Sequence, residues 1–157
     1  MKKTLAGFFA LLLIAGGCLD EPDCYLLNNN VVGIAFKKLT EPNADTALNV
    51  TAFGTVEPPL LFWLGEPPAP EPDTSFTRLT LPLRYFNDET TFFFEEPDTT
   101  RILRLGYTSQ AQFVSEDCGE RYVLSDLRVL EHNFDSVRLI IDVPSRQGGT
   151  IHLQIFR

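Results

Sequence analysis

The chain has 157 residues, with 13 Lys and Arg against 21 Asp and Glu, which gives a formal net charge of -8. This acidity argues against nucleic acid as a partner, because phosphate backbones attract clusters of basic side chains. The length fits one domain with a self-sufficient hydrophobic core.

The first 17 residues have the pattern of a cleaved signal peptide, which begins with Lys2-Lys3. The uncharged run Thr4–Leu19 has 16 residues, whereas a membrane-spanning helix needs about 20. The segment Ala15-Gly16-Gly17-Cys18 resembles a lipobox, with alanine where leucine is usual. The resemblance implies that Cys18 is lipidated and anchors the mature protein to a membrane. The alternative is an ordinary secretory signal with a coincidental cysteine.

An acidic run, Leu19-Asp20-Glu21-Pro22-Asp23, follows the predicted lipidation site. It resembles the export signal that sends lipoproteins of the phylum Bacteroidota to the outer face of the outer membrane. The alternative is a solvated acidic linker on the periplasmic face. We therefore expect an outer-membrane lipoprotein, with the cell surface favoured. The expected division is a signal peptide (1–17), a lipidated tether (18–29) and a domain (30–157).

Three cysteines are present. If Cys18 carries lipid, Cys24 and Cys118 remain as a pair, and a disulfide is the default in an oxidising compartment. Closing so long a loop stabilises the folded chain by up to about 5 kcal/mol in the chain-entropy view. Two free thiols, or a redox or metal site, are the alternatives.

From Val32 onward, apolar residues recur with a period of two, as in half-buried strands. The runs lie at 32–36, 48–53, 79–84, 91–94, 103–107, 110–114, 123–129, 137–143 and 151–155. Turns rich in Pro, Gly, Asn and Asp separate them. After the cleaved signal helix, the pattern predicts an all-β domain, an antiparallel β-sandwich of about 7–9 strands, immunoglobulin-like or related. Pro82 indicates an edge strand or a bulge, because proline lacks the N–H donor.

Segment 57–73 departs from this pattern, because six of the eleven prolines flank its apolar run Leu60–Leu64. Prolines disfavour a helix or a central strand, so we expect a stiff excursion with polyproline character. Leu61, Phe62 and Trp63 are candidate residues for binding a partner protein or a sugar ring. The alternative, which we favour, is a short strand or loop whose apolar residues fold onto the sandwich.

The consecutive aromatic residues Phe92, Phe93 and Phe94 must face both sides of one strand, so at least one points away from the core. They could form an interface, although we favour cover by the proline-rich segment. His132 and His152 are the only histidines and lie on separate expected elements. Because no calcium-loop spacing and no catalytic motif is present, we expect no metal, no cofactor and no enzymatic activity.

Three short segments resemble acceptor sequences for O-glycosylation in exported Bacteroidota proteins. They are Asp45-Thr46-Ala47, Asp98-Thr99-Thr100 and Asp135-Ser136-Val137. Thr46, Thr99 and Ser136 are therefore candidate glycosylation sites. The alternative is simpler, since Asp-Thr and Asp-Ser pairs commonly begin turns.

With its lipobox, its acidic start through Cys24 and its later Glu116-Asp117-Cys118-Gly119 segment, the chain resembles small Bacteroidota lipoproteins of unknown function. The resemblance implies no activity. We expect a non-enzymatic, membrane-anchored protein that contacts a partner protein or a glycan. The alternatives are an envelope hydrolase acting on sugars or peptides, and a structural accessory subunit of an envelope complex. A long unpaired edge strand would favour assembly by strand addition.

Overall fold

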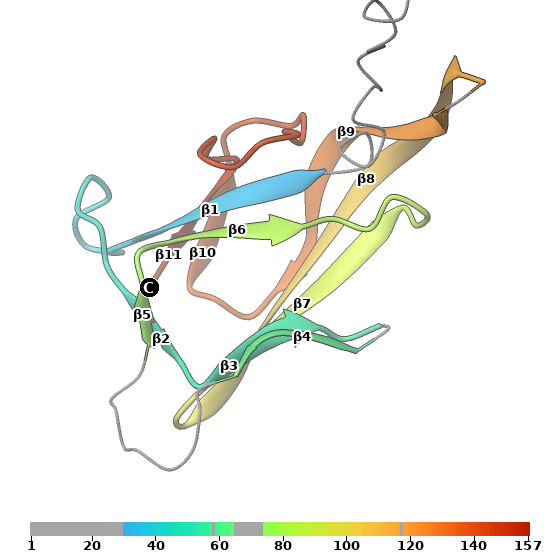
Figure 1. The fold of residues 1–157 in the computed structure, drawn as a ribbon. Coiled ribbons are helices and arrows are strands. Elements are labelled where there is room, and N and C mark those ends of the chain that lie inside the picture. The colour runs from blue at the N-terminus through green and yellow to red at the C-terminus, as the bar shows by residue number, and fades with distance from the viewer. Residues whose placement is uncertain (1–29, 58, 65–73, 117) are drawn as a thin grey trace, which may run out of the picture.

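The structure is a computed structural model that describes residues 30–57, 59–64, 74–116 and 118–157, the side chains of 61–64 and 74 excepted. The described residues form strands and no helix, and their sheets pack over a shared apolar core (Figure 1). The expected all-β sandwich class is thus confirmed, while the expected signal helix lies outside the described residues. In the part of the chain described, no helix is long and apolar enough to cross a membrane.

One layer is a four-stranded sheet with the order β10-β11-β1-β6. Its strands are β10 (Ser136–Leu139), β11 (Leu153–Phe156), β1 (Val31–Lys37) and β6 (Arg78–Pro82). The β1–β11 pair is parallel, with Ile34 opposite Leu153, which departs from the purely antiparallel expectation. β6 lies at the edge of this sheet and ends at Pro82, in agreement with the position expected for that proline.

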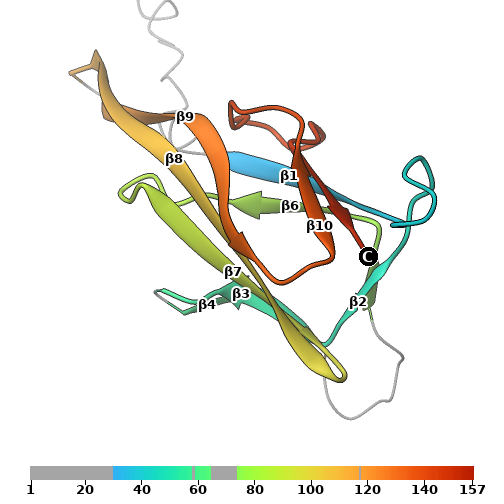
Figure 2. The ribbon, with the colours of Figure 1, turned by 180° about the vertical axis from the view of Figure 1, so that it is seen from behind.

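The other layer is a five-stranded sheet with the order β4-β3-β7-β8-β9 (Figure 2). Its strands are β4 (Leu60–Leu64), β3 (Ala52–Thr55), β7 (Glu89–Glu96), β8 (Thr99–Ser115) and β9 (Gly119–His132), and a separate pair joins β2 (Leu48–Val50) to β5 (Thr74–Phe76). The described residues thus contain more strands than expected. The expected run 48–53 divides into two strands, and two further strands lie at 60–64 and 74–76.

The core lies between the two layers and draws on both. Leu81 of β6 and Ile155 of β11 contribute from one sheet, and Phe92 and Phe94 of β7 contribute from the other. Phe93 is only half-buried on the opposite face of β7, so the expectation that one aromatic of this run points away from the core is confirmed. Each fully buried large apolar side chain contributes about 1.5–3 kcal/mol, and this burial holds the layers together.

β8 and β9 extend well beyond the rest of their sheet. The pairing of β7 with β8 ends at Gly106, whereas β8 pairs with β9 as far as Ser115. Residues 108–115 and 119–125 therefore form a two-stranded projection, which we call the ribbon (Figures 1 and 2). The pairing within the ribbon is regular from Thr108 to Phe113.

Candidate binding site

The sequence-predicted binding residues Leu61, Phe62 and Trp63 lie in β4, the edge strand that pairs with β3. A short strand is the backbone part of the alternative favoured from the sequence, whereas the packing of its apolar side chains stays a prediction. The side chains of these three residues lie outside the description, as do residues 65–73 of the expected excursion. Their roles therefore stay predictions. Leu60, the first residue of β4, is 51% exposed and lines a cavity beside the loop that connects β6 to β7.

A cavity of about 230 Å³ opens between Leu60 and the loop that connects β6 to β7. Its lining residues are Thr55, Leu60, Pro82, Leu83, Arg84, Tyr85, Phe86 and Asn87. Pockets for drug-sized ligands enclose about 300–1,000 Å³, so this cavity suits a single side chain or one part of a larger partner. Most of the lining is aliphatic or aromatic, and it includes no carboxylate and no histidine.

Three aromatic rings from distant parts of the sequence meet beside this cavity. Tyr85 and Phe86 belong to the β6–β7 loop, and Tyr122 belongs to β9. The Tyr85 and Phe86 ring centroids are 4.2 Å apart, and the Tyr122 ring lies 5.2 Å and 5.1 Å from them. Phe86 is nevertheless 73% exposed. We call these three residues the aromatic surface.

The loop that carries two of these aromatics is held by the buried hydroxyl of Tyr107 on β8. This hydroxyl donates to the Arg84 carbonyl at 2.7 Å and accepts from the Arg84 N–H at 3.1 Å. Because its single proton goes to Arg84, the neighbouring Thr90 hydroxyl acts as a donor to it. Burial raises the pKa of Tyr107, and the bonds from Thr90 and Arg84 oppose that shift only in part. The phenol therefore stays protonated and keeps its donor role.

A second contact fixes the next residue of the loop. The Ser109 hydroxyl of β8 donates to the Tyr85 carbonyl, and the Tyr107 N–H donates to the Asp88 carbonyl at 2.8 Å. The loop backbone is thus fastened to β8 through its own polar groups. The Phe86 side chain consequently points outward from a fixed base.

The start of the domain lies against the same site. The buried Asn30 donates through Nδ2 to the Tyr122 carbonyl at 3.1 Å, and its own carbonyl accepts from the Leu83 N–H at 2.8 Å. Asn30 therefore links the beginning of β1 to β9, which carries Tyr122, and to the β6–β7 loop, which carries Tyr85 and Phe86. The chain enters the domain beside this surface.

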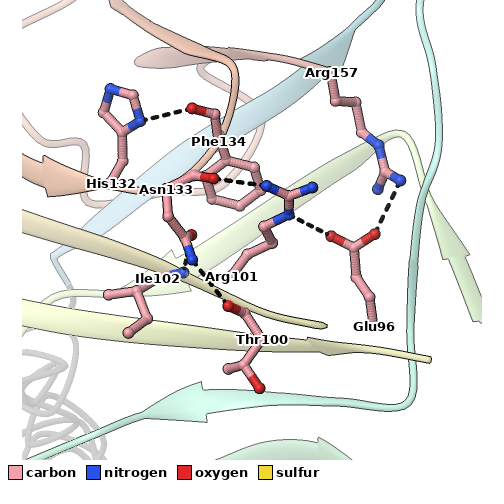
Figure 3. A network of polar contacts seen from close by, with 8 residues as sticks. All are labelled: Glu96, Thr100, Arg101, Ile102, His132, Asn133, Phe134 and Arg157. Carbon is pink, nitrogen blue, oxygen red and sulfur yellow. Dashed lines mark hydrogen bonds and ion pairs between the residues drawn. The ribbon is translucent and has the colours of Figure 1, made fainter. Parts of the chain in front are cut away.

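A second polar network lies at the end of the molecule where β7 turns into β8 (Figure 3). Glu96 accepts from Arg101 Nε at 3.0 Å and from Arg157 Nη2 at 2.9 Å. Arg101 also donates to the Asn133 carbonyl at 2.6 Å and lies 5.8 Å from the Phe134 ring centroid. Both carboxylate oxygens are engaged within the protein, so we interpret this network as a structural clamp on β11.

The two histidines are not brought together. His132 is exposed near the end of β9, whereas His152 is fully buried just before β11. Burial lowers the pKa of His152, and the carbonyls of Thr150 and Val143 oppose that shift. In the part of the chain described, no group of three His, Cys, Asp or Glu side chains is arranged to hold a metal ion.

The structure places the remaining candidates separately. Thr99 is exposed as the first residue of β8, while Thr46 and Ser136 are half-buried. Cys118 is disulfide-bonded, but Cys24 and Cys18 lie outside the described residues, so the Cys24–Cys118 pairing stays a prediction.

Sequence reasoning missed the aromatic surface. The available signal was local: Tyr85-Phe86 precedes the turn residues Asn87-Asp88 and lies just after Pro82. Two large aromatics in a turn are unusual, since turn positions favour small polar residues. Tyr122 joins them only through the packing of β9 against the loop, which no local pattern indicates.

The comparisons with known proteins yield one family. Residues 69–157 match the model of a family of unknown function, DUF6452, and the match spans β5 through β11, including all three residues of the aromatic surface. No curated protein and no solved structure matches the chain. Because the match extends over more than half of the sequence, the chain belongs to this family of unknown function, DUF6452.

Proposed function

We propose that this protein is a membrane-anchored, non-enzymatic binding protein of the bacterial cell envelope that contacts a partner protein through its aromatic surface. The observation that carries the proposal is the 73% exposure of Phe86. This ring lies in a cluster with two other aromatics, beside a cavity, on a loop fixed by Tyr107. Exposed aromatic side chains on a fixed base are typical of the residues that dominate binding energy at interfaces.

The cavity favours a protein over a glycan as the partner. Its volume of about 230 Å³ suits one apolar side chain. Leu60, Pro82, Leu83 and Phe86 bring no polar side-chain atom to the lining, which suits an apolar side chain better than the hydroxyls of a sugar. The hydrolase alternative gains no support here, because two close carboxylates or a Ser–His contact are absent from this lining.

The signal sequence supports the anchor. Lipidation at Cys18 would fix the protein to the outer membrane, and the acidic run after it supports the cell surface, as in Bacteroidota lipoproteins. Asn30 follows Cys18 by 12 residues, so lipidation at Cys18 would keep Asn30, next to the aromatic surface, within roughly 40 Å of the anchor. A Cys24–Cys118 disulfide would hold the ribbon end within roughly 20 Å of the anchor, because only six residues would then separate Cys24 from the lipid.

Two measurements test the lipid anchor and the Cys24–Cys118 disulfide. Cys18→Ser should abolish lipid labelling and retention in the membrane fraction, and unchanged retention would contradict lipidation. Peptide mapping without reduction should find Cys24 linked to Cys118. Free thiols at both positions would contradict that pairing.

Mass spectrometry of the mature protein should find glycan on Thr99 before Thr46 or Ser136, because Thr99 is the exposed one of the three.

The binding proposal is tested with the full lipidated chain in the cells that make it. After chemical crosslinking, affinity isolation should recover the same partner with the wild type and with Ile140→Ala. Ile140 is a matched control because it is 49% exposed and lies away from the cavity lining. Phe86→Ala should lower recovery about tenfold or more, as expected for a central aromatic contact. Equal recovery with all three proteins would contradict the proposal.

A further inference from the structure

We propose that the partner binds by adding a β-strand to the free edge of β8 in the ribbon, along Gln110–Ser115. This inference rests on the proposed function and names the mode of contact. A polypeptide in an extended conformation is the occupant, because only another backbone offers N–H and C=O groups at the spacing of a strand edge.

Among the described residues, no strand lies beside this edge on the side of β7. β9 pairs with β8 through Ser115, but β7 stops pairing with it at Gly106. The β6–β7 loop is then hydrogen-bonded to β8 at Tyr107 and Ser109. Beyond Ser109, none of the described residues pairs with β8 on the side of β7.

This edge also lacks charged residues and prolines, and its pairing with β9 shifts register only near its end, between Phe113 and Ser115. Its sequence is Gln110-Ala111-Gln112-Phe113-Val114-Ser115. Natural edge strands avoid unwanted pairing through charges, prolines, bulges or short length. The edge strand β6 ends at Pro82, and the edge strand β10 has only four residues, including Arg138. On the free edge of β8, by contrast, Phe113 is 71% exposed.

The free edge begins where the aromatic surface ends. Ala111 lies opposite Tyr122 and Ser109 lies opposite the buried Leu124, so these side chains share one face of the ribbon. A strand added beside Gln110 would direct alternate side chains to that face, next to Phe86. Backbone hydrogen bonds would then provide affinity, and the cavity beside Phe86 would select the side chain.

Charge favours a different protein over a second copy of this chain. Removal of the predicted signal peptide takes away two lysines, so the mature chain has 11 basic against 21 acidic side chains and two copies repel each other. Glu116 and Glu120 are exposed at the end of the ribbon, so a partner segment with Lys or Arg near this end is electrostatically complementary. The expected occupant is thus an extended segment that carries one large apolar residue and a basic flank.

Hydrogen–deuterium exchange tests this mode of binding. The full lipidated protein is labelled in the membrane fraction of the cells that make it and, separately, in pure phospholipid vesicles. Amides of Gln110–Ser115 should exchange about tenfold more slowly in the native membrane, because strand pairing protects them. The variant Gln110→Lys with Val114→Lys should lose this protection, since lysines on an edge oppose strand addition.

The matched control carries Gln147→Lys with Val143→Lys, two exposed positions in the connection between β10 and β11. It should keep the protection, and equal thermal unfolding of both variants would show that each is folded. A partner that is recovered and lost with Phe86→Ala, without protection of the β8 edge, would overturn strand addition and leave the proposed function intact. Failure to recover any partner would contradict both. Equal protection in pure vesicles would also overturn the inference, because lipid or a second copy would then cover the edge.

Discussion

Gly33 and His152 are joined by two hydrogen bonds, although 119 residues separate them in the sequence. The Gly33 N–H donates to Nδ1 of His152 at 2.9 Å, and the His152 N–H donates to the Gly33 carbonyl at 2.8 Å. Because Nδ1 accepts a hydrogen bond, the buried imidazole is neutral and carries its proton on Nε2. Among the described residues Nε2 makes no hydrogen bond of standard geometry, although the carbonyls of Thr150 and Val143 favour the charged ring. Protonation would therefore break the bond from Gly33 inside the core.

Stability should consequently fall in mild acid. Burial lowers the pKa of His152 below its ordinary value of 6.5, so the unfolded chain binds a proton at a higher pH than the folded chain. The stabilisation is complete above about pH 6.5 and is lost as the pH falls toward the folded-state pKa. Urea unfolding at a series of pH values checks this. His152→Asn should flatten the pH dependence in this range, and an unchanged pH dependence in this variant would contradict the role given to His152.

Gly33→Ala should destabilise the domain strongly. A Cβ at this position would lie 1.9 Å from the backbone carbonyl oxygen of Thr150, two residues before His152, which is hydrogen-bonded to Gly33. Backbone must shift to accept it, and we expect a loss of about 3 kcal/mol or more in the free energy of unfolding. Gly148→Ala is the control, because its Cβ would approach only the Thr80 side chain, at 3.5 Å. A similar loss in both variants would show that the close approach at Gly33 is not the cause.

Tyr107→Phe should weaken both stability and partner binding. The change removes the donor to the Arg84 carbonyl and the acceptor for Thr90, which leaves buried polar groups unpaired. The expected loss in the free energy of unfolding is about 1–3 kcal/mol. Recovery of the partner should also decline, since the loop that carries Phe86 would lose its hydrogen bonds to the Tyr107 hydroxyl. Tyr85→Phe should change stability by less than about 0.5 kcal/mol. If the two variants unfold alike, the Tyr107 hydroxyl does not anchor the loop.

Glu96→Gln should destabilise the clamp on β11. The Glu96 side chain is only 10% exposed and accepts from two arginines, so the substitution leaves two partly buried cations without their anion. Thermal or urea unfolding should show a loss of about 1–3 kcal/mol. Glu41→Gln should have almost no effect, because Glu41 is exposed and lies 4.0 Å from Lys38. No difference between the two variants would mean that the network of Figure 3 contributes little.

The strands were predictable where one face is buried. In β6, Leu79 and Leu81 alternate with exposed residues, and the period of two reports this directly. The end of β10 was not predictable, because the apolar alternation continues to Val143. In the structure β10 ends at Leu139, the N–H groups of Ile140 and Ile141 both point to the His152 carbonyl, and both side chains are partly exposed.

The binding site was less predictable than the fold. The sequence directs attention to the apolar run Leu60–Leu64, and Leu60 does line the cavity. The exposed ring is Phe86, however, and its cluster depends on contact with Tyr122, 36 residues along the chain. Such contacts follow from how strands are ordered in a sheet. Local periodicity carries no information about that order.

The central claim, that a membrane-anchored protein binds its partner through the aromatic surface, is tested most directly by site-specific photocrosslinking in intact cells. A photoreactive phenylalanine derivative replaces Phe86 in the full lipidated chain, and Ile140 in a matched control. We expect one discrete crosslinked protein from position 86 and none from position 140. Cys18→Ser in the same background should abolish the adduct along with membrane retention. The absence of an adduct at position 86, or the same adduct from both positions, would contradict the account.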